Sequence, residues 1–124
     1  DTLKPISRIA SGGELSRILL AFYALFSEQK PKQLFLFDEI DTGVGGLTAN
    51  TIGTLLQQMA THQQLFCITH LAQIATRANH QIVITKNNQA ATNITTLTYV
   101  HKEKKEQEIK RMLGGETLLK TVHL

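Results

Sequence analysis

Three short stretches of the chain carry residues suited to phosphate chemistry. The first, Ser11-Gly12-Gly13-Glu14, stands at the start of an apolar periodic segment. The first N–H groups of a helix lack partners within the helix, and its N-terminus carries roughly half a positive charge, so this site suits a phosphate. Glycine lets the backbone approach a ligand, and the Ser11 hydroxyl can donate a hydrogen bond. The structural alternative is that Ser11 only caps the helix and the glycines shape a turn.

Two adjacent carboxylates form the second group. Asp38 and Glu39 directly follow the apolar run at 34–37. Mg²⁺ prefers oxygen ligands and keeps several waters, so Asp38 could hold the ion directly or through water. Glu39 could then orient or deprotonate an attacking water. Two alternatives stay open: an exposed acidic strand end, and a metal nuclease that uses Asp38, Glu39 and Asp41.

His70 is the third candidate, because it follows the apolar run at 65–69. Its imidazole could donate a hydrogen bond to a transferring phosphate, although a histidine in this position also serves as a local structural contact. Cys67 is the one cysteine, which excludes a disulfide within the chain. It is better explained as a small buried side chain than as a nucleophile, and it fits a reducing compartment.

The periodicity predicts the elements that hold these groups. Apolar residues recur at helical spacing over 14–28 and again around Ile52, Leu55, Leu56 and Met59. The runs at 34–37 and 65–69 are continuous, which is typical of strands buried on both faces of a parallel sheet. A short helix is predicted over 71–78. Ligand-binding groups gather beyond the carboxyl ends of such strands, where Asp38, Glu39 and His70 stand.

The last third of the chain has a different pattern of apolar and polar residues. Segments 81–85 and 93–100 predict two strands joined by a turn at 87–89, an antiparallel hairpin at the sheet edge. A charged helix is predicted over 102–113 and ends at Gly114-Gly115. We therefore expect one α/β domain over residues 1–124, with parallel strands flanked by helices.

The composition is that of a globular protein. The 124 residues are 42% hydrophobic and 19% charged, and 13 basic against 10 acidic residues give a net charge of +3. This weak basic excess permits contact with phosphate-rich partners without indicating a nucleic-acid groove. No apolar run reaches the roughly 18 to 20 residues of a membrane span, so we expect a soluble, cytoplasmic protein without a membrane partner.

The candidate stretches together resemble the ATP-binding-cassette ATPases of the SMC-like group. The series of SGGE, DE and His is specific for this superfamily, and the continuations "DTGVGG" and "THLAQIA" favour its bacterial DNA-repair branch. The resemblance implies the C-terminal lobe of an ABC-type P-loop ATPase head. The matching stretches are "ASGGELSRILLAF" (10–22), "LFLFDEIDTGVGG" (34–46), "CITHLAQIA" (67–75) and "EIKRMLGG" (108–115).

The resemblance also implies a role for each motif. Residues 11–14 would be the signature motif, which reaches the γ-phosphate of ATP bound to the opposite subunit. Asp38 would serve Mg²⁺, and Glu39 would be the catalytic base. His70 would be the switch histidine that senses the γ-phosphate in its own subunit.

The D-loop implied by the resemblance runs along the dimer seam over residues 41–46. It begins with Asp41, Thr42 and Gly43, and Gly45 stands where many cassette ATPases have an aspartate. A side-chain role is therefore not carried over to Gly45.

The chain contains no G-x-x-x-x-G-K-[ST] loop, and that loop cradles the β- and γ-phosphates. We therefore expect the chain alone to be inactive. The resemblance implies that the loop lies in an N-terminal lobe beyond a coiled coil, that ATP joins two heads, and that the complete nucleoid-associated molecule acts on DNA in double-strand-break repair and recombination. Two alternatives remain: a non-enzymatic interaction module that docks through 11–15 and 41–46, and a head lobe of a different SMC-like ATPase.

Overall fold

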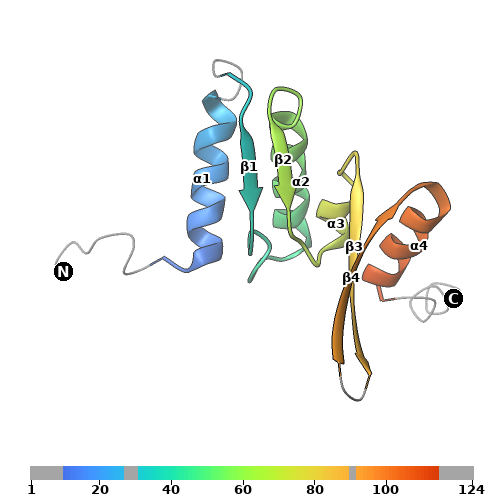
Figure 1. Cartoon of the computed structure of the whole chain (residues 1–124). Coiled ribbons are helices and arrows are strands. Elements are labelled where there is room, and N and C mark those ends of the chain that lie inside the picture. Colours follow the sequence, from blue (N-terminus) through green and yellow to red (C-terminus); the bar gives the residue numbers. More distant parts are fainter. Residues whose placement is uncertain (1–9, 27–30, 90–91, 115–124) are drawn as a thin grey trace, which may run out of the picture. The chain divides into compact units, whose positions relative to one another are not determined.

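The computed structural model describes residues 10–26, 31–89 and 92–114. The chain divides between Arg77 and Ala78 into two compact units (Figure 1), and each is considered by itself.

The first unit alternates helices with two parallel strands. Strands β1 (Leu34–Phe37) and β2 (Gln64–Cys67) pair from Leu34 opposite Gln64 to Phe37 opposite Cys67, which confirms the predicted parallel arrangement. Its helices are α1 (Gly12–Phe26), α2 (Gly46–Met59) and α3 (Ala72–Ala75). The predicted third helix is thus shorter than expected.

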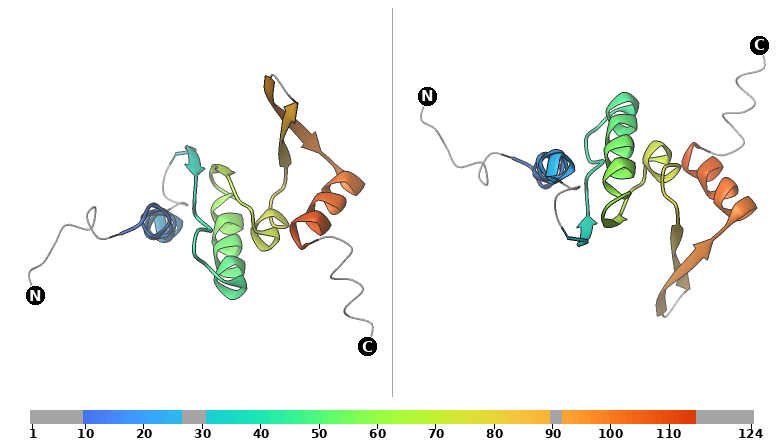
Figure 2. Two further views of the ribbon diagram at one scale, coloured as in Figure 1. Left: turned by 90° about the horizontal axis from the view of Figure 1, so that it is seen from below. Right: turned by 90° about the horizontal axis from the view of Figure 1, so that it is seen from above.

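The core of this unit lies between the strands and the two longer helices. Views along the strands show α1 and α2 on the same side of β1 and β2 (Figure 2). The predicted apolar stripe of α2 faces inward, because Ile52, Leu56 and Met59 are buried and Leu55 is half-buried. The buried cluster consists of Leu20, Phe37, Ile40, Ala49, Ile52, Leu56, Met59 and Ile74.

The opposite face of the two strands is open, so the prediction of burial on both faces was wrong. Leu34 and Leu36 on β1 are 63% and 69% exposed, and Phe66 on β2 is also exposed. The physical reason is that alternate side chains of a strand point to opposite faces. Among the described residues, the helices of this unit cover only one face of the β1–β2 sheet.

The second unit is a hairpin followed by a helix. Strands β3 (Gln81–Gln89) and β4 (Thr92–Val100) pair antiparallel, and α4 (Lys102–Met112) follows. The hairpin is confirmed, but it forms a sheet of its own rather than an edge of the β1–β2 sheet. Gly114 has a φ of 100°, as expected for a helix end, while Gly115 lies outside the described residues.

The predicted turn at residues 87–89 was wrong. These residues continue β3 and lie opposite Ile94, Asn93 and Thr92. Asparagine is frequent in turns, but cross-strand pairing decides the backbone of a two-stranded ribbon. The connection is therefore shorter than the sequence indicated.

Candidate functional site

The N-terminus of α1 is closed by a reciprocal cap. The Glu14 N–H donates to Ser11 Oγ at 3.3 Å, and the Ser11 N–H donates to Glu14 Oε2 at 2.9 Å. This is the capping box of an S-x-x-E sequence. The hydrogen bonds from Ser11, with the positive charge of Arg17 nearby, lower the pKa of Glu14. The structural alternative for Ser11 as a cap is therefore realised: its hydroxyl accepts from the Glu14 N–H and also interacts with the Glu14 carboxylate.

The two glycines of this stretch lie against the turn that follows β1. A Cβ on Gly12 would meet Glu39 Oε2 at 2.9 Å, and one on Gly13 would meet the Glu39 carbonyl oxygen at 2.8 Å. Gly13 is buried, and its hypothetical Cβ would also lie 3.3 Å from the Cβ of Thr42. The glycines thus have a packing reason within this unit, besides any approach to a ligand.

Asp38 and Glu39 stand exposed at the carboxyl end of β1. The Glu39 N–H donates to Asp38 Oδ1 at 2.9 Å, and the Ser16 hydroxyl donates to the Asp38 carbonyl oxygen at 3.2 Å. Glu39 adopts a φ of 56°, a left-handed conformation that costs a residue with a Cβ roughly 1–2 kcal/mol. Such backbone strain persists where the surroundings enforce it and is frequent at functional sites.

The carboxylate of Asp38 fits the preference of Mg²⁺ for oxygen ligands. It is exposed at a strand end, where a cation that keeps several waters can reach it. Among the described residues, no group of three or more His, Cys, Asp or Glu side chains lies close enough together to hold a metal. A magnesium ion here would therefore take further ligands from water or from a bound phosphate.

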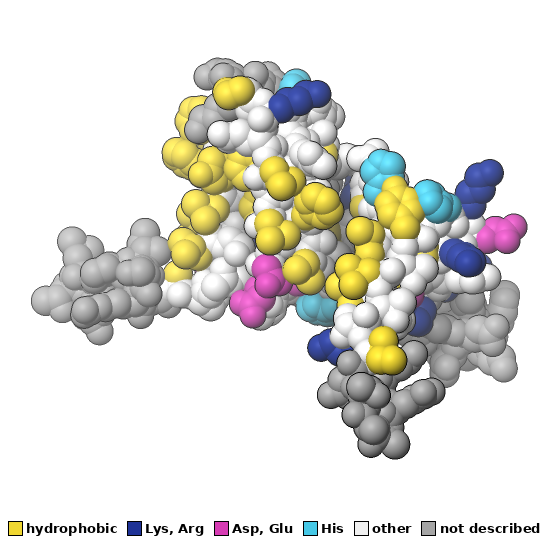
Figure 3. Space-filling model, viewed as in Figure 1, with side chains coloured by type: hydrophobic (Ala, Val, Ile, Leu, Met, Phe, Trp, Pro, Cys, Tyr) yellow, Lys and Arg dark blue, Asp and Glu magenta, His cyan; other side chains and the backbone are white. Residues whose placement is uncertain are grey.

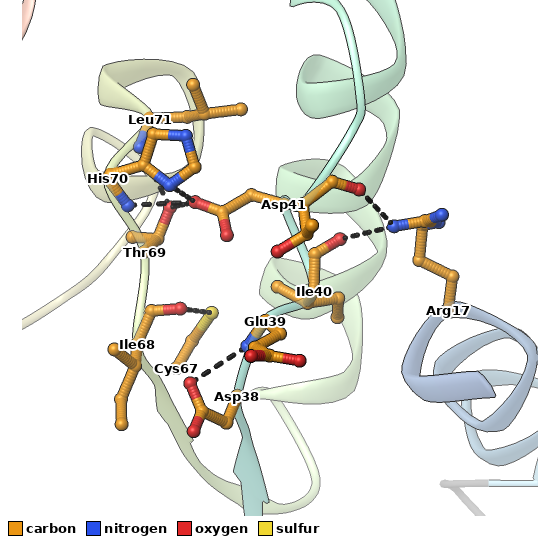
Figure 4. Close-up of polar contacts among 11 residues, drawn as sticks. Arg17, Asp38, Glu39, Ile40, Asp41, Cys67, Ile68, Thr69, His70 and Leu71 are labelled. Atoms are coloured by element: carbon orange, nitrogen blue, oxygen red, sulfur yellow. Dashed lines mark hydrogen bonds and ion pairs between the residues drawn. The ribbon is translucent and has the colours of Figure 1, made fainter. Parts of the chain in front are cut away.

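Asp41 turns inward, away from the two exposed carboxylates (Figure 4). It is 3% exposed, and its Oδ2 accepts from Thr69 Oγ1 at 2.6 Å and from the His70 N–H at 2.8 Å. His70 Nδ1 lies 3.0 Å from the same oxygen. Burial raises the pKa of Asp41, but the hydrogen bonds from Thr69 and the His70 amide outweigh it, so the pKa is lowered.

Arg17 connects α1 to the loop that contains Asp41. One of its terminal nitrogens donates to the carbonyl oxygens of Ile40 at 3.2 Å and Thr42 at 3.0 Å (Figure 4). No motif or residue pattern in the sequence predicted a role for Arg17 or Thr69. The only signal for Arg17 was its position three residues after Glu14, one helical turn further along.

Cys67 is half-buried on β2, which agrees with the expectation that it is not a nucleophile. Burial, with the negative charges of Asp41 and Asp38, raises the pKa of its thiol to about 12. The thiolate, which is the reactive form, is therefore scarce at neutral pH.

The fold brings most of the predicted site residues to one end of the first unit. Gly12 and Gly13 contact the turn at Glu39, and Asp41 joins that turn to His70. Thr42 and Gly43 are exposed on the same loop, and Gly43 has a φ of 70°. The imidazole of His70 is 72% exposed, so its far nitrogen faces outward.

Comparison with solved structures defines the class of fold. An SMC ATPase head from work on ATP-driven dimerisation and DNA-stimulated activation of SMC ATPases superposes with a TM-score of 0.62. The match has 21% identity and covers 91% of this chain and 67% of the other. The Smc head domain of Pyrococcus yayanosii gives a TM-score of 0.66 at 22% identity, over 83% of this chain and 19% of that one. The chain has the fold of an SMC-type ATPase head lobe.

Comparison with protein sequences identifies a family within this class of fold. The chain is 41% identical to the DNA repair protein RecN of Treponema pallidum over 117 residues, 94% of this chain. It is 39% identical to RecN of Bacillus subtilis over 93% of the chain, and 36% identical to RecN of Vibrio cholerae over 94%. Over the part that it spans, the chain belongs to the RecN family.

This chain spans about a fifth of the length of these relatives, 20% or 21% of each. No family model matches it. Within the residues that the structure describes, no helix is long and apolar enough to cross a membrane.

Proposed function

We propose that this chain is the C-terminal lobe of a RecN-type ATPase head, which binds and hydrolyses ATP where two heads meet. The observation that carries the proposal is the meeting of three motifs at one end of the parallel strands. The glycines at the start of α1 lie against Glu39, and Asp41 in the same loop contacts His70. This is also the end at which parallel α/β sheets bind ligands.

The carboxylates after β1 would act on ATP bound to the same head. Asp38 would hold Mg²⁺, which neutralises charge on the phosphates when bound. Glu39 would orient the attacking water and take its proton, a function typically worth about 10²- to 10⁴-fold in rate. His70 would contact the γ-phosphate.

The start of α1 would act on the ATP of the opposite head. The N–H groups of Gly12 and Gly13 and the hydroxyl of Ser11 would bind the γ-phosphate there, with Glu14 holding the cap in shape. Thr42 and Gly43, exposed on the neighbouring loop, would lie along the seam between the heads.

The first partner would be the lobe that carries the missing phosphate-binding loop. Hydrophobic side chains lie across α1 and the open face of the two strands (Figure 3). Ile18 and Phe22 on α1 are exposed like Leu36 and Phe66 on the strands. Large exposed apolar patches mark interaction sites. We propose that the N-terminal lobe of the same protein covers this face.

The relatives' name indicates the process in which the complete molecule would act. Each is a DNA repair protein, and the complete molecule would engage DNA in double-strand-break repair and recombination, in the bacterial cytoplasm at the nucleoid.

The proposal is tested by Mg²⁺-dependent ATP hydrolysis of this chain alone and co-folded with the N-terminal lobe of its own protein. We expect hydrolysis only in the combined sample and its loss in Glu39→Gln. Because the substitution removes the base but leaves nucleotide binding, Glu39→Gln should accumulate the ATP-bound dimer in light scattering. The matched control is Glu108→Gln on α4, which removes a carboxylate paired with Arg111 at 2.6 Å and should keep the wild-type rate.

The alternative is an interaction module that docks through 11–15 and 41–46 and ignores nucleotide. A folded combined sample without ATP-dependent dimerisation or hydrolysis would favour this module and overturn the ATPase proposal. Mg²⁺-dependent cleavage of DNA by the purified chain, lost in Asp38→Asn, would instead indicate a nuclease.

A further inference from the structure

We propose that Asp41 is a positioning residue for His70: it holds the imidazole by Nδ1 and leaves Nε2 directed toward the γ-phosphate of the nucleotide in its own head. This inference rests on the proposed ATPase function and deepens it. It assigns Asp41 a task inside its own head, whereas the D-loop to which it belongs was expected to act at the seam between heads.

The burial of Asp41 favours this assignment. Its side chain is 4% exposed, so a second head cannot reach the carboxylate without rearrangement. One oxygen, Oδ2, lies within hydrogen-bonding distance of Thr69 Oγ1, the His70 N–H and His70 Nδ1. A buried carboxylate that accepts several hydrogen bonds is strongly oriented, because each bond to an ionised group is stronger than a neutral one.

The backbone around His70 is held by the same carboxylate. Thr69 Oγ1 donates to Asp41 and accepts from the Leu71 N–H at 3.1 Å. The hydroxyl therefore fixes the residues on both sides of His70. Asp41 thus sets the position of the histidine backbone through Thr69 and the amide, and the orientation of the ring through Nδ1 (Figure 4).

The contact at Nδ1 defines what Nε2 can do. A carboxylate accepts and does not donate, so a hydrogen bond across this 3.0 Å contact requires the proton to be on Nδ1. In the imidazolium, Nε2 then has a proton to donate to a phosphate oxygen. In the neutral ring, Nε2 is a bare acceptor that can take a hydrogen bond from water. The imidazole is 72% exposed, so it is accessible to a ligand.

The test uses the full-length protein that contains this segment. It compares ATP hydrolysis by wild type, Asp41→Asn, His70→Ala and the double variant, with Glu108→Gln as the carboxylate control. Asn keeps the size of the side chain and one oxygen acceptor but loses the charge. We expect Asp41→Asn to lower kcat by about 10- to 100-fold, the range typical when the carboxylate that orients a metal-ligating histidine is changed. KM for ATP should change less than twofold, because Asp41 does not touch the nucleotide.

The double variant separates positioning from general damage. If Asp41 acts through His70, Asp41→Asn costs nothing further in the His70→Ala background. Losses that multiply in the double variant, or an unchanged kcat in Asp41→Asn, would overturn this inference while leaving the ATPase proposal intact. A wild-type protein without hydrolysis would overturn both. A His70→Ala variant at the wild-type rate would overturn this inference and the proposed role of His70, but not the ATPase proposal.

Discussion

At the scale of single residues, the two glycines at the start of α1 differ in what surrounds them. The Cβ of Gly12→Ala would meet the far end of the Glu39 side chain, which can rotate away. The Cβ of Gly13→Ala would meet the backbone of Glu39 at 2.8 Å, which cannot move without shifting the turn. The same substitution to alanine is therefore expected to reduce stability little at Gly12 and much more at Gly13.

We expect Gly13→Ala to destabilise the protein by about 1–3 kcal/mol, as overpacking usually does, and Gly12→Ala to cost much less. Thermal unfolding of the two variants in the full-length protein measures the difference. In hydrolysis, Gly12→Ala should still be impaired, because the displaced atom belongs to the Glu39 carboxylate. Equal unfolding midpoints for the two variants would contradict this packing argument.

Asp41 makes the stability of the first unit depend on pH. Its pKa in the folded state is below the ordinary value of 3.8, so the carboxylate stabilises the fold above that value, and the contribution is lost as pH falls through the lowered pKa. Asp41→Asn removes this contribution at neutral pH. We expect the variant to be less stable than wild type at pH 7 and the gap to close as pH falls below 3.8. Acid unfolding followed by circular dichroism would refute this if the two curves stayed parallel.

At the scale of elements, Arg17 fastens α1 to the loop between β1 and α2. Its guanidinium donates to two backbone carbonyl oxygens, those of Ile40 and Thr42, at 3.2 and 3.0 Å. The loop itself is held by the Thr42 N–H donating to the Glu39 carbonyl oxygen at 3.1 Å. The Arg17 side chain therefore holds α1 and this loop together.

Arg17→Met keeps the aliphatic stem but removes the nitrogen that donates both hydrogen bonds. We expect a loss of about 1–3 kcal/mol, since hydrogen bonds from charged groups are the stronger ones, and faster hydrogen exchange at the amide of Thr42. The amide of Thr76, which donates to the Ala72 carbonyl oxygen at 2.9 Å in α3, is the internal control. Equal acceleration at Thr42 and Thr76 would indicate general loosening rather than loss of this anchor.

At the scale of the whole molecule, the open apolar face predicts that this lobe is stabilised by a partner. Fully burying a large apolar side chain contributes roughly 1.5–3 kcal/mol, and several such residues lie exposed here. Leu36→Asp on the open strand face should therefore block assembly with the N-terminal lobe. Asn50→Asp, an exposed position on α2 on the covered side, is the matched control. Co-purification of the two lobes measures the effect, and assembly that survives Leu36→Asp would show that the partner lies elsewhere.

Local patterns were enough to predict much of this fold. Continuous apolar runs indicated β1 and β2, and their shared direction put Asp38, Glu39 and His70 at strand ends that pair in parallel. The helix cap at Ser11 was one of the two interpretations of its stretch, and the structure shows this cap with Glu14 as its partner. These features depend on neighbours within a few residues, so the order of residue types along the chain determines them.

Only the tertiary structure decided which way the loop residues face. In the sequence, Asp41 is one of three neighbouring acidic residues, together with Asp38 and Glu39. Only the path of the loop directs its side chain to His70, 29 residues away. Arg17 was likewise an ordinary basic residue of a helix. Its hydrogen bonds form only because the fold places that helix beside a loop 23 to 25 residues further along the chain. An apolar run likewise indicates that a strand becomes buried, but it does not indicate which part of the protein covers the strand. In this structure one face of β1 stays exposed. The sequence by itself determined the residue types and their local order, whereas contacts at such separations required the packed backbone, because a hydrogen bond depends on distance and direction in space.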